Sequence, residues 1–113
     1  MLKYVRRDPQ EIEGIPDPCG TVWPMFTESD SSVAEFFIVK SHDAIPHYHK
    51  KITEFYHVLD GSGKLMLDSE EIPLKKGVTI MINPGTTHRA VGDLSVIVVC
   101  VPAGVYQDTH EVE

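Results

Sequence analysis

The sequence predicts an all-β fold class, and three observations support this. Breakers are frequent, with eight glycines and eight prolines among 113 residues. The segments between them are about five to eight residues long and rich in β-branched and aromatic side chains, as strands are. No segment keeps a helical periodicity over about ten residues. A chain of this length is expected to form a single domain over 1–113, and the pattern leaves three architectures open: an immunoglobulin-like sandwich, a small closed barrel and a jelly roll.

The expected elements follow the breakers along the chain. Residues 1–20 are polar and proline-rich, which predicts an irregular N-terminal arm. A short edge strand is expected at 21–26, where Pro24 interrupts it, and a turn at 28–32. The sequence DGSG predicts a hairpin between strands at 54–59 and 63–68. The other expected strands are 33–40, 70–74, 78–82, 88–91 and 94–101, followed by an acidic tail at 106–113.

Composition and charge exclude several kinds of partner. Ten Lys and Arg residues stand against seventeen Asp and Glu, giving a net charge of −7. There is no basic stripe, so we expect neither a nucleic-acid partner nor an anionic membrane surface. No run of about eighteen apolar residues is present to cross a membrane, and the N-terminus lacks the apolar middle of a signal peptide. These features predict a cytoplasmic protein.

The two cysteines agree with a reducing compartment. Cys100 lies in an apolar strand and is expected to be an inert, buried side chain. Cys19 lies in a loop rich in proline and glycine and could be exposed. No CxxC pair is present, which disfavours a zinc finger or a thioredoxin-type site. A disulfide between the two cysteines stays open but is disfavoured in the cytoplasm.

Two histidines one residue apart indicate a metal site. His47 and His49 project from one face of an extended segment, whereas Tyr48 projects from the other. Glu54 opens the next strand, and a Pro-Gly turn delivers His88 at the start of a later one. Three imidazole nitrogens and a carboxylate suit a divalent transition metal ion, namely Fe, Mn, Ni or Zn, with Co also suitable. Calcium and magnesium are disfavoured because they prefer oxygen ligands.

These residues and their spacing resemble the two motifs of the cupin superfamily, in particular its small, single-domain, metal-binding members. The H-x-H, Glu and Gly of the first motif are matched by His47-Tyr48-His49, Glu54 and Gly61. The Gly, Pro-x-Gly and His of the second motif are similar to Gly77, the pair at 84–85, and His88. The resemblance covers about residues 33–101.

The resemblance implies a jelly-roll β-barrel, a homodimer, and a metal ion held by His47, His49, Glu54 and His88. Three departures from the family pattern concern turns rather than ligands. Ser41 stands where the first motif begins with glycine, Asn83 lies near the usual proline position, and Gly92 replaces the final asparagine.

Two side chains near the cluster are candidates for catalysis. Tyr56 shares a strand face with Glu54 and could line a pocket, although a core position is equally plausible. His57 lies on the opposite face and is a weaker candidate for an acid–base role. Ser41, His42 and Asp43 are the residue types of a hydrolase triad, but neighbouring side chains point apart, so we interpret them as a loop.

Several other conspicuous side chains have ordinary interpretations. Arg89 is expected to face away from the metal, and His110 is expected to be solvated in the acidic tail. Four aromatic residues are interpreted as core or dimer contacts: Trp23, Phe26, Phe36 and Phe37.

The pattern predicts a metal-dependent enzyme that acts on a small, oxygen-rich organic molecule. By resemblance the reaction is of the dioxygenase, decarboxylase, lyase or isomerase type, so an oxidoreductase is one of the options. The alternative is a non-catalytic cupin module that binds a small ligand, because no clear general base accompanies the expected ligands. A third option is a structural protein without metal.

Overall fold

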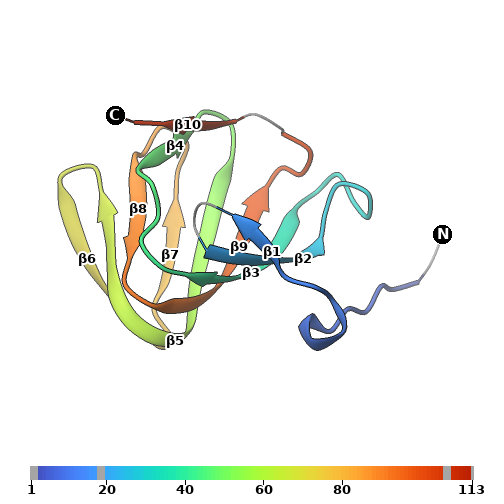
Figure 1. Cartoon of the computed structure of the whole chain (residues 1–113). Coiled ribbons are helices and arrows are strands. Elements are labelled where there is room, and N and C mark those ends of the chain that lie inside the picture. The colour runs from blue at the N-terminus through green and yellow to red at the C-terminus, as the bar shows by residue number, and fades with distance from the viewer. Residues whose placement is uncertain (1–2, 18–19, 106–107, 113) are drawn as a thin grey trace.

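The computed structural model describes residues 3–17, 20–105 and 108–112 (Figure 1). Within these ranges a short 3₁₀ helix, η1 (Pro9–Glu11), precedes ten strands. The strands are β1 (Ile15–Asp17), β2 (Gly20–Phe26), β3 (Glu35–Ser41), β4 (His47–His49), β5 (Thr53–Leu67), β6 (Glu70–Lys75), β7 (Thr79–Ile82), β8 (His88–Val91), β9 (Leu94–Val101) and β10 (Thr109–Glu111). No helix among the described residues is long and apolar enough to cross a membrane.

The strands form an antiparallel sheet that bends back on itself into two layers (Figure 1). One layer contains β1, β2, β3, β9, the first part of β5 and β7, in that order. The other contains β10, β4, β8, the second part of β5 and β6. Because β5 belongs to both layers, the sheet curls into an open barrel with an inner and an outer face. The predicted all-β jelly-roll barrel is confirmed.

The predicted hairpin around DGSG was wrong, because β5 runs through this sequence as one bent strand. Gly61 has a φ of 89°, and a Cβ at this position would lie 2.3 Å from the backbone oxygen of Asp93. The register with β9 shifts between Val58 and Asp60. The glycines therefore let the turn between β8 and β9 approach β5 closely, and they carry the strand from one layer into the other.

Both ends of the chain contain strands that the sequence did not predict. Ile15–Asp17, expected in the irregular arm, forms β1 and pairs with β2. Thr109–Glu111, expected in the acidic tail, forms β10 and pairs with β4 beside it at the top of Figure 1. Each added strand provides backbone partners for an edge that would otherwise present unpaired N–H and C=O groups. Polar composition alone gives no sign of this pairing.

The hydrophobic core lies between the layers and is built from alternate residues of each strand. In β9, Leu94, Val96 and Val98 point inward and are at most 6% exposed, and they belong to one cluster with Val58 and Leu65 of β5. The same alternation puts Glu54 of β5 and Cys100 of β9 on the inner face, beyond the apolar cluster along each strand. The interior thus contains buried polar residues as well as the apolar cluster.

The four aromatic residues expected in the core are half-buried. Phe37 packs against the core cluster, in agreement with the expectation. Phe26 and Phe36 contact each other edge to face, with ring centroids 6.3 Å apart. Trp23 is in register with Ile38 of β3. Their use as dimer contacts stays a prediction.

Candidate metal centre

Strand β4 presents both of its histidines to the barrel interior. His47 and His49 are each 8% exposed, whereas Tyr48 between them is half-buried on the opposite face. Tyr48 stacks on His110 of β10, with ring centroids 5.1 Å apart. The side chain of His110 is 32% exposed, so it is partly solvated as expected, and the pairing of β10 with β4 also lays its ring on Tyr48. This stack supports the strand that carries the two inner imidazoles.

Glu54 and His88 complete a buried cluster with the two histidines of β4. Glu54 lies at the start of β5, and His88 opens β8 directly opposite His47 in the ladder. Glu54 is 5% exposed and His88 is 1% exposed. One potential ligand atom from each of the four residues lies within 4.8 Å of the others. The structure thus brings together all four residues that the sequence predicts as ligands.

Each imidazole is oriented by a backbone carbonyl group. The distances from Nδ1 to the carbonyl oxygen are 2.8 Å for His47 and Ile45, 3.0 Å for His49 and Asp108, and 2.9 Å for His88 and Thr86. A carbonyl oxygen can only accept, so each Nδ1 carries a proton and donates it. In a neutral imidazole this leaves the lone pair on Nε2, as in a histidine that binds a metal through that atom.

The Glu54 carboxylate lies against two of these Nε2 atoms. Its Oε1 is 2.7 Å from Nε2 of His49 and 3.0 Å from Nε2 of His88. Burial disfavours the charged form of Glu54, but the contacts with His49 and His88 outweigh burial and lower its pKa to about 2. Glu54 is therefore ionised at neutral pH and offers a negatively charged oxygen to the cluster.

The pKa values of two of the histidines shift in opposite directions, although burial opposes a charge on both. Burial lowers the pKa of His47, which favours the neutral, lone-pair-bearing ring. Burial also opposes a charge on His49, but the nearby carboxylates of Glu54 and Asp108 outweigh it and raise the pKa of His49. The raised pKa of His49 favours protonation of its Nε2 beside Glu54, and a metal ion bound there would replace that proton.

The four side chains fit a divalent transition metal ion. Nε2 of His49 is buried and lacks a well-directed hydrogen bond, although the Glu54 oxygen lies close to it. A cation between the two atoms would satisfy both. Two ligand atoms at about 2.1 Å from one ion are at most about 4.2 Å apart, so the cluster, with its span of 4.8 Å, would have to contract slightly around an ion. Nitrogen and carboxylate donors together suit Zn, Fe, Mn, Ni or Co.

A cavity of about 460 Å³ opens onto this cluster from the barrel interior. Val39, Val96 and Val98 supply apolar wall, and Tyr56 and Cys100 line it beside the cluster. The Tyr56 ring lies edge-on to His88, with ring centroids 6.3 Å apart. Both roles considered for Tyr56 agree with this geometry, because its side chain lines the cavity and also packs against the core cluster. The cavity has the size of a site for a small organic molecule.

Cys100 packs against the core as expected, but the sequence interpretation missed its position at the cavity wall. It was expected to be an inert core side chain, but its Sγ lies 3.9 Å from Oε2 of Glu54 at the cavity wall. Burial, together with the negative charges of Glu54 and Glu35, raises the pKa of the thiol, so it stays protonated. Strand alternation from Leu94 could have placed it on the inner face. Cys19, the other cysteine, lies outside the described residues.

Asp108 is a second residue that was missed. Its carboxylate accepts hydrogen bonds from the backbone N–H groups of Lys50, Lys51 and Ile52, at 3.0, 3.0 and 3.1 Å. Burial opposes its ionisation, but these amides outweigh burial and lower its pKa. Its carbonyl also accepts from Nδ1 of His49. Asp108 therefore joins the C-terminal segment to the loop between two candidate ligands, through partners 56 to 58 residues away that no local pattern reveals.

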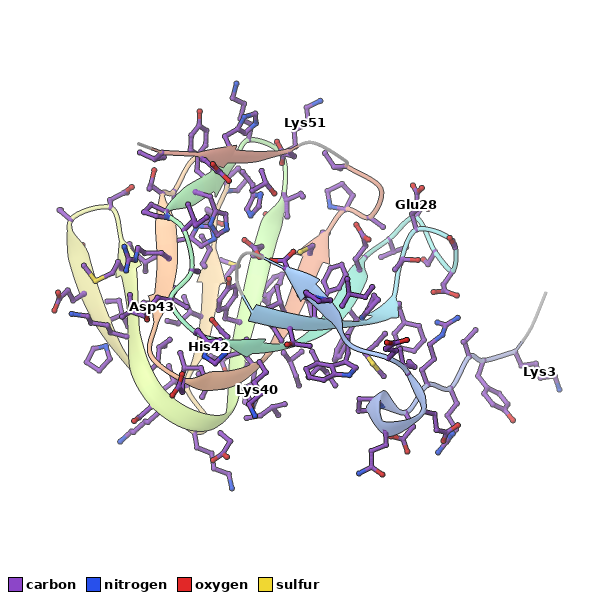
Figure 2. All side chains as sticks on the ribbon, viewed as in Figure 1. Lys3, Glu28, Lys40, His42, Asp43 and Lys51 are labelled. Atoms are coloured by element: carbon purple, nitrogen blue, oxygen red, sulfur yellow. The ribbon has the colours of Figure 1, made fainter. Side chains whose placement is uncertain are left out.

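The other predicted candidates lie away from the cluster. His57 is on the outer face of β5, with Nδ1 2.6 Å from Oγ1 of Thr79, so this geometry does not support an acid–base role beside the metal. His42 contacts Asp93 at 2.9 Å, and the Asp43 carboxylate accepts from a turn amide, so no triad forms. Figure 2 shows His42 and Asp43 below Lys51, which lies two residues after His49. Arg89 follows His88 on the opposite face of β8, as expected.

Comparison with known proteins finds uncharacterized relatives. A protein of Methanocaldococcus jannaschii is 33% identical over 86 residues, which is 73% of this chain and 69% of the relative. A protein of Aquifex aeolicus is 32% identical over 68 residues, which is 58% of this chain and 56% of the relative. The chain thus spans little more than half the length of the Aquifex protein.

Solved structures share the whole architecture. A protein from Planctomyces limnophilus has a TM-score of 0.84 at 27% identity, with 97% of this chain and 96% of that chain covered. A variant of Streptomyces Pac13 with uridine has a TM-score of 0.86 at 20% identity, covering 100% and 93%, and Pac13 is described as a nucleoside dehydratase. Ectoine synthase from P. lautus has a TM-score of 0.82 at 12% identity, covering 97% and 91%. The last two likenesses show the fold alone.

The family follows from the sequence match as well as from the barrel. Residues 32–102, more than half of the chain, match the family model of the cupin domain. This range contains both histidine motifs and all four residues of the buried cluster. The chain therefore belongs to the cupin domain family.

Proposed function

We propose that this protein is a metal-dependent enzyme that acts on a small, oxygen-rich organic molecule bound in the barrel cavity. The observation that supports this most strongly is a buried cluster of four potential ligands, three of which, His47, His49 and Glu54, line a cavity of about 460 Å³. His47, His49, Glu54 and His88 would hold the ion. When bound, the ion would polarise a substrate oxygen or lower the pKa of a water molecule.

The side chains around the cluster give the site its other properties. The valine walls of the cavity place apolar surface beside the cluster, which strengthens the interactions of charges inside it. Tyr56 and Cys100 place a phenol and a protonated thiol beside the cluster. Of the two, Tyr56 is our candidate for transferring a proton to or from the bound molecule.

The type of reaction stays open among dioxygenation, decarboxylation, lyase chemistry and isomerisation. Pac13 and ectoine synthase are enzymes that have this fold, which agrees with a catalytic role. Uridine, present with Pac13, is an uncharged and oxygen-rich molecule of the size class that we propose. These neighbours share too little sequence identity to assign their reactions to this chain.

The test begins with elemental analysis of protein purified without chelators. We expect about one equivalent of a transition metal, and turnover of at least one member of a panel of enolisable carbonyl compounds and catechols with and without oxygen. Glu54→Gln should abolish turnover while the fold is retained, whereas Glu70→Gln, an exposed position on β6, should change nothing. Turnover that persists in metal-free protein would contradict the proposal.

A non-catalytic module that binds a small ligand is the second candidate. It is favoured by the raised pKa of Cys100, because a protonated thiol cannot serve as a base at neutral pH. Saturable binding of a panel compound without any product, under air and under nitrogen, would support this candidate over the enzyme.

The homodimer implied by the family resemblance is also a proposal. Phe55, Met81 and Val101 are 37%, 57% and 36% exposed, and they lie on the outer face of neighbouring strands β5, β7 and β9. An exposed apolar patch of this kind suits self-association. Light scattering at micromolar concentration should give twice the 12.6 kDa chain mass, and a monomer would contradict the dimer.

A further inference from the structure

The charged side chains of the cavity are strongly biased towards one sign. In addition to Glu54, the carboxylates of Asp17, Glu35 and Glu111 line it. Among the described residues that line the cavity, none is a lysine or an arginine. A divalent ion beside Glu54 would leave one positive charge, which the carboxylates of Glu35 and Glu111 alone exceed. The cavity is therefore negative even when a metal is bound.

Glu35 has a defined position relative to the metal centre. It lies opposite Cys100 in the ladder between β3 and β9, and Cys100 lies opposite Glu54 in the ladder between β9 and β5. The three residues form a row across the inner face, so Glu35 and Glu54 are two strand spacings apart, or about 10 Å. Oε1 of Glu35 accepts a hydrogen bond from the N–H of Gly104 at 3.2 Å, which anchors the side chain.

The other two carboxylates come from the ends of the sheet. Asp17 belongs to β1 and Glu111 to β10, the first and last strands in the order of the sheet. Both residues are exposed to solvent, and the valines that line the same cavity are apolar. Carboxylates above low-dielectric walls concentrate a negative potential at the entrance, which attracts cations and repels anions.

We propose that the cavity selects a small molecule that carries a cationic nitrogen group, such as an ammonium, within about 10 Å of the oxygen that approaches the metal centre. This proposal rests on the proposed function and narrows its substrate class, because it disfavours a substrate with a free carboxylate or phosphate at the end that lies near Glu35. Near Glu35, an anionic group would lose hydration and face only carboxylates. An ammonium group in the same place would gain Glu35 as an ion-pair partner.

Three catechols whose side groups carry a positive charge, no charge and a negative charge test this selection. Dopamine carries an ammonium, 4-methylcatechol is uncharged, and 3,4-dihydroxyphenylacetate carries a carboxylate, while all three share the same pair of metal-binding oxygens. Each is titrated under nitrogen into Co(II)-loaded protein, with the visible absorption of cobalt and calorimetry as readouts. Dopamine should bind at least about ten-fold more tightly than the carboxylate at low salt, with the uncharged probe between them. This gap in affinity between dopamine and the carboxylate should narrow as salt is added, because salt screens the charges.

Variants identify the groups responsible. Glu35→Gln and Glu111→Gln should each reduce the gap between dopamine and the carboxylate by about three-fold. Gln at position 35 retains an oxygen that can accept from Gly104. Glu70→Gln removes an exposed carboxylate outside the cavity and should leave the gap unchanged. Thermal unfolding and elemental analysis verify that every variant is folded and retains its cobalt.

The outcomes separate this inference from the function on which it rests. Equal affinities, or tighter binding of the carboxylate, would overturn the charge selection while the metal-dependent function stands. A gap that both glutamine variants leave intact would overturn it as well. Failure of the wild-type protein to bind cobalt would overturn the proposed function and this inference together.

Discussion

Removing the carboxylate of Asp108 should destabilise the protein by detaching the C-terminal strand from the loop between two candidate ligands. In Asp108→Ala, three backbone N–H groups lose their acceptor. Lys50 and Lys51 are exposed residues, so water can accept from their N–H groups in place of the lost carboxylate. Ile52 is only 8% exposed, so its N–H is left without a partner.

The cost is set mainly by the buried amide. An unsatisfied buried donor costs about 1 to 3 kcal/mol, so the free energy of unfolding should fall by about 2 kcal/mol. For a domain of this size that lowers Tm by roughly 8 °C. The carbonyl that orients His49 also belongs to Asp108, so the affinity for Co(II) should fall by about ten-fold. Asp108→Asn keeps one acceptor oxygen and should lose about half as much stability.

Thermal unfolding of metal-free protein and calorimetry with Co(II) measure the two effects. Asp43→Ala is the matched control, because its carboxylate accepts a single exposed N–H, from Gly92, and should lose less than about 1 kcal/mol. If Asp108→Ala unfolds at the same temperature as Asp43→Ala and binds Co(II) like the wild type, Asp108 does not hold the loop as we describe.

Three further predictions test other parts of the molecule. Glu54 has a pKa of about 2, below its usual 4.5, so its stabilisation is present above pH 4.5 and is lost as the pH falls towards 2. Metal-free wild type should therefore lose unfolding free energy more steeply over this range than Glu54→Gln, and equal slopes in urea titrations would contradict this. Gly61→Ala should cost more than about 2 kcal/mol, because a Cβ there meets a backbone oxygen at 2.3 Å. Gly77 also has a positive φ but has open space around it, so Gly77→Ala should cost only about 1 kcal/mol. Similar urea midpoints for Gly61→Ala and Gly77→Ala would refute the argument. His57→Ala should leave the Co(II) affinity within about two-fold in calorimetry, since its ring lies on the outer face, and a large loss would show that it reaches the centre.

The sequence predicted the fold class and the composition of the cluster because both depend on simple periodicities. Alternation in a strand decides which residues share a face, so His47 and His49 could be paired from spacing alone. The same rule relates Glu54 to Tyr56 and excludes His57 from their face. The position of His88 beside them required the family resemblance, since nothing local states that β8 lies next to β4.

The features that were missed depend on contacts between distant segments. The glycines at 61 and 63 suggested a turn, but they instead make room for the turn between β8 and β9. The C-terminal segment has an acidic composition that is typical of a solvated end, yet β4 offers it an open edge. Asp108 serves amides that are 56 to 58 residues away. Such roles follow from the tertiary structure and have no signature in the local sequence.

The negative lining of the cavity also became visible only in three dimensions. Asp17, Glu35 and Glu111 belong to three strands that are far apart in the sequence. In the sequence each is one of seventeen acidic residues without a distinguishing neighbour. Sequence spacing therefore locates the metal centre far better than it locates the groups that recognise a substrate.

The central claim is that His47, His49, Glu54 and His88 hold one divalent transition metal ion. Anomalous diffraction at the zinc edge, from crystals grown with one equivalent of Zn(II), tests it most directly. We predict a single strong peak inside the barrel, about 2.0 to 2.2 Å from Nε2 of each histidine and from a Glu54 oxygen. A peak only at other residues, or no peak among these four side chains, would contradict the claim.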